Sequence, residues 1–349
     1  MELFRPLEGF SVTVSVALAP TDHDREWATI VDSLTRRGFL AGLGVSMTAV
    51  VAGCRTGSET SAGSGSAALV GVRDEYGDID VPADPRRIVV VHVSAAATLL
   101  DLGVPAERIV GGFFGQAGVQ GDAVLRSMPE AAGIPNIGTA GTWNLEAIVG
   151  TDPDLVVMLT NGGEYFTKTR NELASTGVPV FAGFNGYLTW AELERLVTTV
   201  GVGVRRESEA AALVDRTRRR RDDLRARLSA QASLPTVALL RAGDGGVVYT
   251  QVDPLLDALG FPGDRPTPEQ FAIEIPAEKI DTVTSDVVIV SAFGDFDDAR
   301  ARMAANPLWE RLPAVRAGRV HYVDDSLWGA GYSPRATQMR FDDIERIFT

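Results

Sequence analysis

The sequence contains one cysteine, two lysines and three histidines among its 349 residues. A lone cysteine cannot form a disulfide within the chain, so stability outside the cytosol would have to come from packing. The chain also lacks a nucleophile elbow, a glycine-rich phosphate loop, a His-Glu-x-x-His motif and paired cysteines. These absences favour a protein that binds a ligand, and we predict that the chain is not an enzyme.

Long hydrophobic runs are also missing. A helix that crosses a bilayer needs about 20 apolar residues, whereas the run from Phe39 to Ala52 is shorter and follows Arg36 and Arg37. A basic front edge, a short apolar run and small residues before a cleavage point are typical of a secretory signal. We therefore predict export, and the segment around Arg36 and Arg37 resembles a twin-arginine signal.

The single cysteine, Cys54, directly follows this apolar run. The sequence Val51-Ala52-Gly53-Cys54 resembles a lipobox, in which the cysteine is acylated and becomes the mature N-terminus. Alternatively, the two arginines begin an ordinary helix and Cys54 is a buried free thiol. The Ser/Gly/Thr-rich stretch after Cys54, which has the composition of a flexible tether, favours the lipoprotein. Residues 1–33 carry six acids and two arginines, unlike a signal, so we expect the true start to lie downstream.

The charge balance is acidic. The formal net charge is −13, and residues 1–53 hold four arginines against six acids, which leaves −11 on the mature part. This balance argues against a nucleic-acid partner. Only His92 and His321 remain after the predicted cleavage, so a His-rich zinc site is nearly excluded. We predict no directly bound metal and no resident cofactor.

The mature sequence alternates apolar strands with helices. Continuous apolar runs at 88–91, 155–159 and 287–290 are typical of strands buried on both faces. Between the two groups of strands, residues 205–229 contain no Gly or Pro and carry apolar residues at helical spacing. At about 1.5 Å per residue, such a helix would be about 37 Å long and should bridge two lobes. Its run of four arginines, 218–221, points in different directions around the helix and is expected to be solvated.

We therefore predict an α/β fold with two Rossmann-like lobes, each with a mostly parallel sheet, joined by one long α-helix with a ligand cleft between them. The expected parts are an N-terminal extension and signal (1–53), a tether (54–68), an N-terminal lobe (69–204), a bridging helix (205–231) and a C-terminal lobe (232–349).

Several sequence blocks support one family. They are Arg73-Asp74, the segment from Val81 to Val89, Asn144 to Ile148 followed by Asp152 to Val156, and Pro307-Leu308-Trp309 with Gly318-Arg319-Val320. In this order, behind a lipoprotein signal, the chain resembles the substrate-binding lipoproteins of iron-siderophore, haem and cobalamin importers over residues 70–348. The resemblance implies a stiff helical hinge, small closure on ligand binding and delivery to an ATP-driven (ABC) permease. The protein is then expected to be lipid-anchored on the outer face of the cytoplasmic membrane, in the periplasm or cell envelope.

Two acids are candidates for contact with the permease. Glu146 follows Asn144 in the first turn of an expected helix, and Glu278 follows Pro276 in another. A carboxylate there complements the helix dipole by about 0.3 to 1 kcal/mol, which is a sufficient structural reason. In the resembled family, one such acid per lobe docks onto arginines of the permease, and we assign this role to both residues.

The candidate ligand residues follow expected strands, because loops at the carboxyl ends of strands face the crevice in open α/β sheets. They are His92, Trp143, Asn161, Tyr165, Arg241, Tyr249, Trp328, Tyr332 and Arg335. Aromatic rings and guanidiniums suit a ferric siderophore, a large and often anionic metal chelate. Each residue could equally be structural.

Other functions stay open at this point. The chain could bind haem, with His92, Tyr249 or Tyr332 as iron ligand, or cobalamin. It could also be an envelope scaffold or signalling module that keeps the fold without transport.

Overall fold

The computed structural model describes residues 68–114, 117–139, 141–185, 189–231, 233–242, 248–263, 272–329 and 332–349. The predicted signal and acylation residues Arg36, Arg37 and Cys54 lie outside these ranges. The described residues belong to one compact unit, Gly65–Thr349.

An antiparallel hairpin precedes the first lobe. Its strands are β1 (Leu69–Asp74) and β2 (Gly77–Pro82), which pair over their full length. The side chain of Asp74 is fully buried, and its carboxylate accepts backbone N–H groups from Tyr76, Gly77 and Ala182. Because Ala182 lies in the first lobe's sheet, this carboxylate attaches the hairpin to the lobe.

The N-terminal lobe contains a five-stranded parallel sheet with the strand order β5-β4-β3-β6-β7. Its strands are β3 (Ile88–Val90), β4 (Ile109–Phe113), β5 (Asn136–Gly138), β6 (Leu155–Thr160) and β7 (Val180–Phe184). The helices of this lobe are α2 (Val93–Asp101), α3 (Ala123–Arg126), α4 (Leu145–Gly150), α5 (Glu164–Ala174) and α6 (Trp190–Gly203). Every residue of β3 and β6 is buried, as continuous apolar runs predict for parallel strands.

The C-terminal lobe contains a second five-stranded sheet, which is mixed, with the order β10-β9-β8-β11-β12. Its strands are β8 (Val237–Ala242), β9 (Val248–Gln251), β10 (Ala272–Ile275), β11 (Val287–Ala292) and β12 (Val320–Asp324). Strands β8, β11 and β12 are parallel, and β9 and β10 are antiparallel additions. The helices are α8 (Pro254–Leu259), α9 (Phe296–Ala304), α10 (Pro313–Arg316), α11 (Asp325–Trp328) and α12 (Pro334–Phe348). The predicted two-lobed α/β fold is confirmed.

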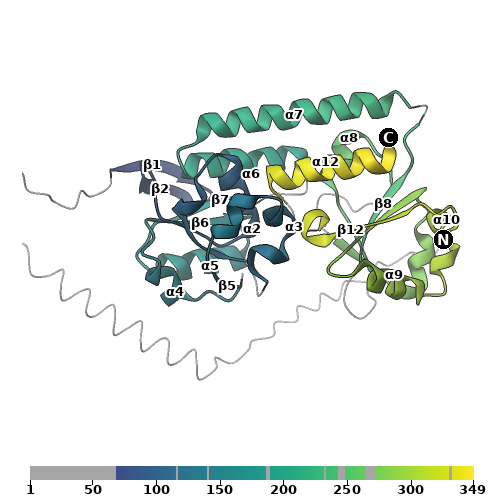
Figure 1. The fold of residues 1–349 in the computed structure, drawn as a ribbon, viewed down its shortest axis with the longest axis horizontal. Coiled ribbons are helices and arrows are strands. Elements are labelled where there is room, and N and C mark those ends of the chain that lie inside the picture. The colour runs from purple at the N-terminus through teal and green to yellow at the C-terminus, as the bar shows by residue number, and fades with distance from the viewer. Residues whose placement is uncertain are drawn as a thin grey trace, which may run out of the picture. The chain divides into compact units, whose positions relative to one another are not determined.

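The long helix α7 (Glu207–Ser229) follows the first lobe and precedes the second, and it runs along one edge of both lobes in Figure 1. It contacts α6 of the first lobe, α8 of the second, and α12. Its buried face includes Leu213, Leu224 and Leu228. Among the described residues, no helix is long and apolar enough to cross a membrane.

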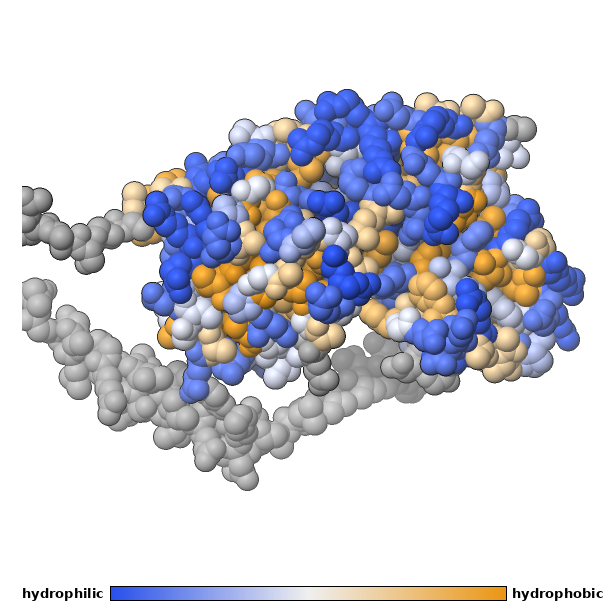
Figure 2. Space-filling model, viewed as in Figure 1, coloured by the Kyte–Doolittle hydropathy of each residue, from blue (hydrophilic) through white to orange (hydrophobic). Residues whose placement is uncertain are grey.

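The arginine run on α7 agrees only in part with the prediction of solvated side chains, because Arg218 and Arg219 are exposed and Arg220 and Arg221 are half-buried. Arg218 forms an ion pair with Glu194 at 2.5 Å, Arg220 pairs with Asp342, and Arg221 stacks over the Trp190 ring at 4.6 Å. Arg218 and Arg221 reach α6, Arg220 reaches α12, and Arg219 is exposed. Figure 2 shows the upper edge of the molecule, where α7 runs, as largely hydrophilic.

The described residues form an apolar core of three clusters. One cluster lies within the N-terminal lobe and includes Val89, Phe113 and Met158. A second cluster lies within the C-terminal lobe around Leu240 and Val290. The third and largest cluster contains buried residues from both lobes and from α7 and α12. A continuous core under α7 opposes large relative movement of the lobes, because opening it would expose apolar surface to water.

Candidate functional site

The two lobes meet at residues that follow the carboxyl ends of parallel strands. The backbone N–H of Ala123, which follows β4 in the chain, donates to Ser326 Oγ at 2.9 Å, and Ser326 is the second residue after β12. Beside it, Arg126 and Asp324 form an ion pair across the lobes at 3.5 Å. Figure 2 shows the surface indented between the two lobes on the side away from α7. This crevice is the candidate ligand site, since strand-end loops form binding sites in α/β sheets.

On the C-terminal side, a polar network holds Arg241 at the end of β8. Its Nη2 donates to Asp325 Oδ2 at 2.6 Å, and Ser291 Oγ donates to Asp325 Oδ1 at 2.8 Å. Asp325 is fully buried, and burial raises the pKa of its carboxyl group although the Arg241 charge opposes that shift. The Arg241 side chain keeps 30% of its surface exposed. A guanidinium with one fixed N–H and its remaining donors outward can bind an anion.

An exposed aromatic ring lies against this arginine. Phe293 directly follows β11, is 57% exposed, and has the Arg241 guanidinium 5.4 Å from its ring centroid. The sequence analysis did not select Phe293. The available signal was a large aromatic residue placed immediately after the continuously buried strand 287–292 and before Gly294. Tyr249 is half-buried and faces Arg241 in the pairing of β8 with β9.

On the N-terminal side, Tyr165 is the most accessible of the predicted aromatic residues. It is 56% exposed in the first turn of α5 and packs edge to face on Phe166, with ring centroids 5.3 Å apart. Asn161 is exposed at the end of β6, and its Oδ1 accepts the N–H of Gly163. Trp143 is half-buried and contacts Phe113 edge to face at 5.1 Å, so part of its ring supports the core.

His92 caps α2. Its Nδ1 accepts the backbone N–H of Ser94 at 3.1 Å, and burial lowers the pKa of the imidazole to about 4. The ring is therefore neutral at neutral pH, with Nδ1 already used as an acceptor. This arrangement gives His92 a sufficient structural role at the end of β3.

Three other predicted ligand residues have structural partners. Trp328 is only 3% exposed, and its Nε1 donates to Asp343. The Tyr332 hydroxyl donates to the Gly329 carbonyl at 2.6 Å, and Arg335 lies 3.6 Å from Asp101. The structure thus places Trp328 in the core, and it places Arg335 in an ion pair between α12 and α2.

The two predicted docking acids are both exposed. Asn144 caps α4 by accepting the Ala147 N–H at 3.0 Å, which sets Glu146 in the first turn. Glu278 lies in the first turn of the 3-10 helix Ala277–Thr282, after Pro276. Next to Glu146 on α4, the side chain of Val149 is 52% exposed.

The fold and the crevice define a class, the two-lobed α/β solute-binding proteins with a helical bridge. The sequence matches the model of the periplasmic binding protein family over residues 88–327, and the chain belongs to this family. The prediction that it is not an enzyme is confirmed, because the family and the relatives it resembles are solute-binding proteins.

Three relatives show the extent of the similarity. The siderophore-binding lipoprotein YfiY of Bacillus subtilis, named as probable, is 28% identical, with 86% of this chain and 94% of that protein covered. The Fe(3+)-citrate-binding protein YfmC of the same organism is 23% identical, with 80% and 86% covered. The crystal structure of Staphylococcus aureus SirA complexed with staphyloferrin B is 17% identical, with a TM-score of 0.64 and 80% and 98% covered, which shows a shared fold.

Proposed function

We propose that the mature chain captures a ferric siderophore in the crevice between its lobes and delivers it to the transmembrane subunits of an ABC permease. The observation that carries the proposal is the similarity to a relative named as a probable siderophore-binding lipoprotein, which covers 86% of this chain and 94% of that protein. Acylation of Cys54 would hold the protein on the outer face of the cytoplasmic membrane. Export through a twin-arginine signal at Arg36 and Arg37 belongs to the same proposal.

The exposed side chains that we assign to the crevice suit such a ligand. A ferric siderophore is bulky and often anionic, so it needs a fixed cation and flat apolar surfaces. Arg241 supplies a guanidinium whose orientation is set by buried Asp325, and Phe293 and Tyr165 supply exposed rings. With a charge of −11 on the mature part, the attraction for an anion has to be local.

Ligand binding is tested by tryptophan quenching of the mature chain carrying Cys54→Ser, titrated with ferric hydroxamate, catecholate and carboxylate siderophores, haem and cobalamin. Arg241→Met should weaken binding of an anionic complex about tenfold or more, since a hydrogen bond to a charged group contributes roughly 1.5–3 kcal/mol. Arg311→Met, an exposed arginine of the same lobe, is the matched control. A Soret band with haem, and no response to any siderophore, would refute the ligand assignment.

Docking is tested by charge reversal. Glu146→Arg with Glu278→Arg should abolish siderophore uptake by cells and leave the affinity of the purified protein unchanged. The matched control reverses one exposed acid in each lobe, Glu107→Arg and Glu310→Arg, and should keep uptake. Loss of ligand affinity in the Glu146/Glu278 variant, or equal loss of uptake in the control, would contradict the docking role.

Anchoring has its own test. Mass spectrometry of the membrane-bound protein should show a mature chain that begins at acylated Cys54, and Arg36→Lys with Arg37→Lys should leave the precursor inside the cell. Peptides from residues 1–33 in the exported protein would contradict the proposed processing.

A further inference from the structure

A small polar pocket lies at the amino-terminal ends of strands β3 and β4, away from the strand ends that border the crevice. Its volume is ≈ 80 Å³, and its charged lining consists of Asp84, Arg108, Arg205 and Arg206. Ile88 and Val104 form part of its apolar wall. The lining thus presents three guanidiniums and one carboxylate, while Glu207 and Glu209, which are not part of the lining, form ion pairs with Arg205 and Arg206.

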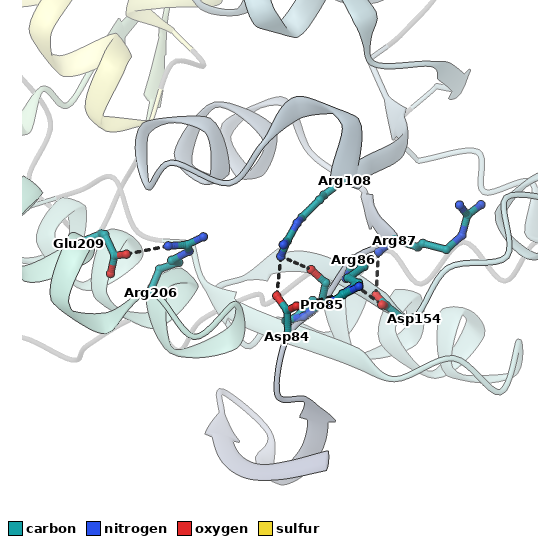
Figure 3. Close-up of polar contacts among 8 residues, drawn as sticks. All are labelled: Asp84, Pro85, Arg86, Arg87, Arg108, Asp154, Arg206 and Glu209. Carbon is teal, nitrogen blue, oxygen red and sulfur yellow. Dashed lines mark hydrogen bonds and ion pairs between the residues drawn. The ribbon is translucent and has the colours of Figure 1, made fainter. Parts of the chain in front are cut away.

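The arginines of the pocket are fixed, but each keeps spare donors. Arg108 Nη1 donates to Asp84 Oδ1 at 2.5 Å and to the Pro85 carbonyl at 3.2 Å, while Arg206 Nη1 donates to Glu209 at 2.8 Å. Figure 3 shows Arg108 pointing onto Asp84 and Pro85, with Arg206 and Glu209 beside them. A guanidinium has five N–H groups, so these contacts orient the side chains without using most of their donors.

The Asp84 carboxylate is shared between two guanidiniums. It also accepts Nε of Arg86 at 3.0 Å, and the hydrogen bonds from Arg108 and Arg86 lower the pKa of its carboxyl group. A second carboxylate, Asp154, is not part of the pocket lining and accepts the backbone N–H groups of Arg86 and Arg87 (Figure 3). Arg205 pairs with Glu207 at 2.5 Å through its Nη1.

The pocket is adjacent to the point where the predicted tether joins the folded unit. The N–H of Ala83, which lines the pocket, donates to the Ala68 carbonyl at 2.8 Å. Residues 55–67, which separate Cys54 from Ala68, can span at most about 45 Å at roughly 3.5 Å per residue. Acylation of Cys54 would therefore hold this face of the protein within about 45 Å of the lipid headgroups.

We propose that the Arg108/Arg205/Arg206 pocket binds a phosphate-type oxyanion, and that its source is the headgroup of an acidic phospholipid in the membrane to which the protein is anchored. Bidentate guanidinium contacts suit phosphate oxygens. The bound headgroup would orient the anchored protein on the bilayer. The choice of the lipid source rests on the anchoring proposed above, whereas the oxyanion site itself does not.

The test uses the mature chain with Cys54→Ser, so that acylation plays no part. Its sedimentation with phosphatidylcholine vesicles that contain 30% phosphatidylglycerol is compared with pure phosphatidylcholine vesicles at about 0.1 M salt. Each arginine near an anionic surface contributes about fivefold to binding, so Arg108→Gln with Arg206→Gln should weaken binding roughly 30-fold. Arg300→Gln with Arg311→Gln removes the same charge from the other lobe and should lose far less.

A second arm measures the effect of inorganic phosphate on the melting temperature, against chloride at equal ionic strength. Stabilisation of the wild type, lost in the Arg108/Arg206 variant, together with vesicle binding supports the whole proposal. Stabilisation by phosphate without vesicle binding supports the oxyanion site and overturns the lipid source. No phosphatidylglycerol-dependent binding and no phosphate effect, or equal losses in the control pair, overturns both.

Two checks distinguish a failure of this inference from misfolding of the variants and from a failure of the proposed siderophore binding. The melting temperature and circular dichroism of each variant report folding, and Arg108→Lys, which keeps the charge but not the bidentate guanidinium, should bind vesicles more weakly than wild type and more tightly than Arg108→Gln. Siderophore quenching should be unchanged in the Arg108/Arg206 variant, because the pocket is at the opposite strand ends from the crevice. A failed siderophore titration with intact vesicle binding would refute the ligand assignment and leave the pocket in place.

Discussion

The ion pair between Asp101 on α2 and Arg335 on α12 predicts an unusual pH dependence of stability. Asp101 Oδ1 lies 3.6 Å from Arg335, but its Oδ2 is buried and has no hydrogen-bond partner among the described residues. Burial raises the pKa of this carboxyl group from 3.8 to about 6, against the opposing charges of Arg335 and Arg216, and Glu130 adds to the rise. Desolvation is thus the largest effect on this side chain.

The sign follows from proton linkage. A carboxyl group with a raised pKa in the folded state binds its proton more tightly when folded, so its contribution to stability is fully present below about pH 4 and is lost as the pH rises through about 6. A shift of about two units corresponds to roughly 3 kcal/mol at pH 7. Asp101→Asn removes the charge and keeps the shape, and it should raise the free energy of unfolding by up to about 3 kcal/mol at pH 7.

Urea unfolding of Asp101→Asn and wild type at pH 7 and pH 4 measures this effect. The difference in unfolding free energy should be large at pH 7 and close to zero at pH 4, where the wild-type carboxyl group is also neutral. Asp298→Asn, which removes an exposed carboxylate of α9, is the control and should change little at either pH. If Asp101→Asn destabilises the protein at pH 7, the ion pair with Arg335 outweighs desolvation and the reasoning is wrong.

Three further substitutions test the packing. Arg340→Met should lower the unfolding free energy by about 3–5 kcal/mol in urea, because it leaves the carboxylate of Asp253 buried without its ion-pair partner; a loss below about 1 kcal/mol would contradict this. Gly329→Ala should cost about 1–3 kcal/mol and lower the melting temperature, because a Cβ atom there would collide with the Asp325 carboxylate; an unchanged melting temperature would show that Asp325 can move. Thr189→Ala should cost about 1 kcal/mol by removing the capping box of α6, and an unaltered urea midpoint would refute that role.

The ligand residues show how far sequence reasoning reached. Position after a strand indicated which side chains could lie at the carboxyl ends of the sheets, but it could not say which way each side chain points. Trp328 and Arg335 occur in such segments, yet Trp328 is buried and hydrogen-bonded to Asp343, and Arg335 turns to Asp101. Phe293 was missed because an aromatic residue after a strand has the same sequence signature whether its ring is exposed or buried.

The arginine pocket also could not be predicted from the sequence. Asp84, Arg108 and Arg206 are far apart in the chain, and their nearness depends on how β3, β4 and the start of α7 pack together. Nothing in local spacing distinguishes these arginines from the many others, because 31 of the 33 basic residues are arginine.

The sequence by itself determined the class of the fold. Hydrophobic periodicity and helix length are local properties, so they can be read from the sequence without knowing the tertiary contacts. Apolar runs placed the buried strands, and the uninterrupted segment 205–229 marked the bridging helix that runs from Glu207 to Ser229. Only the tertiary structure decided that Arg241, held by the buried carboxylate of Asp325, and Phe293 form one exposed cationic and aromatic surface. Such a surface depends on side-chain direction and on contacts between distant strands, which the order of residues along the chain does not encode locally.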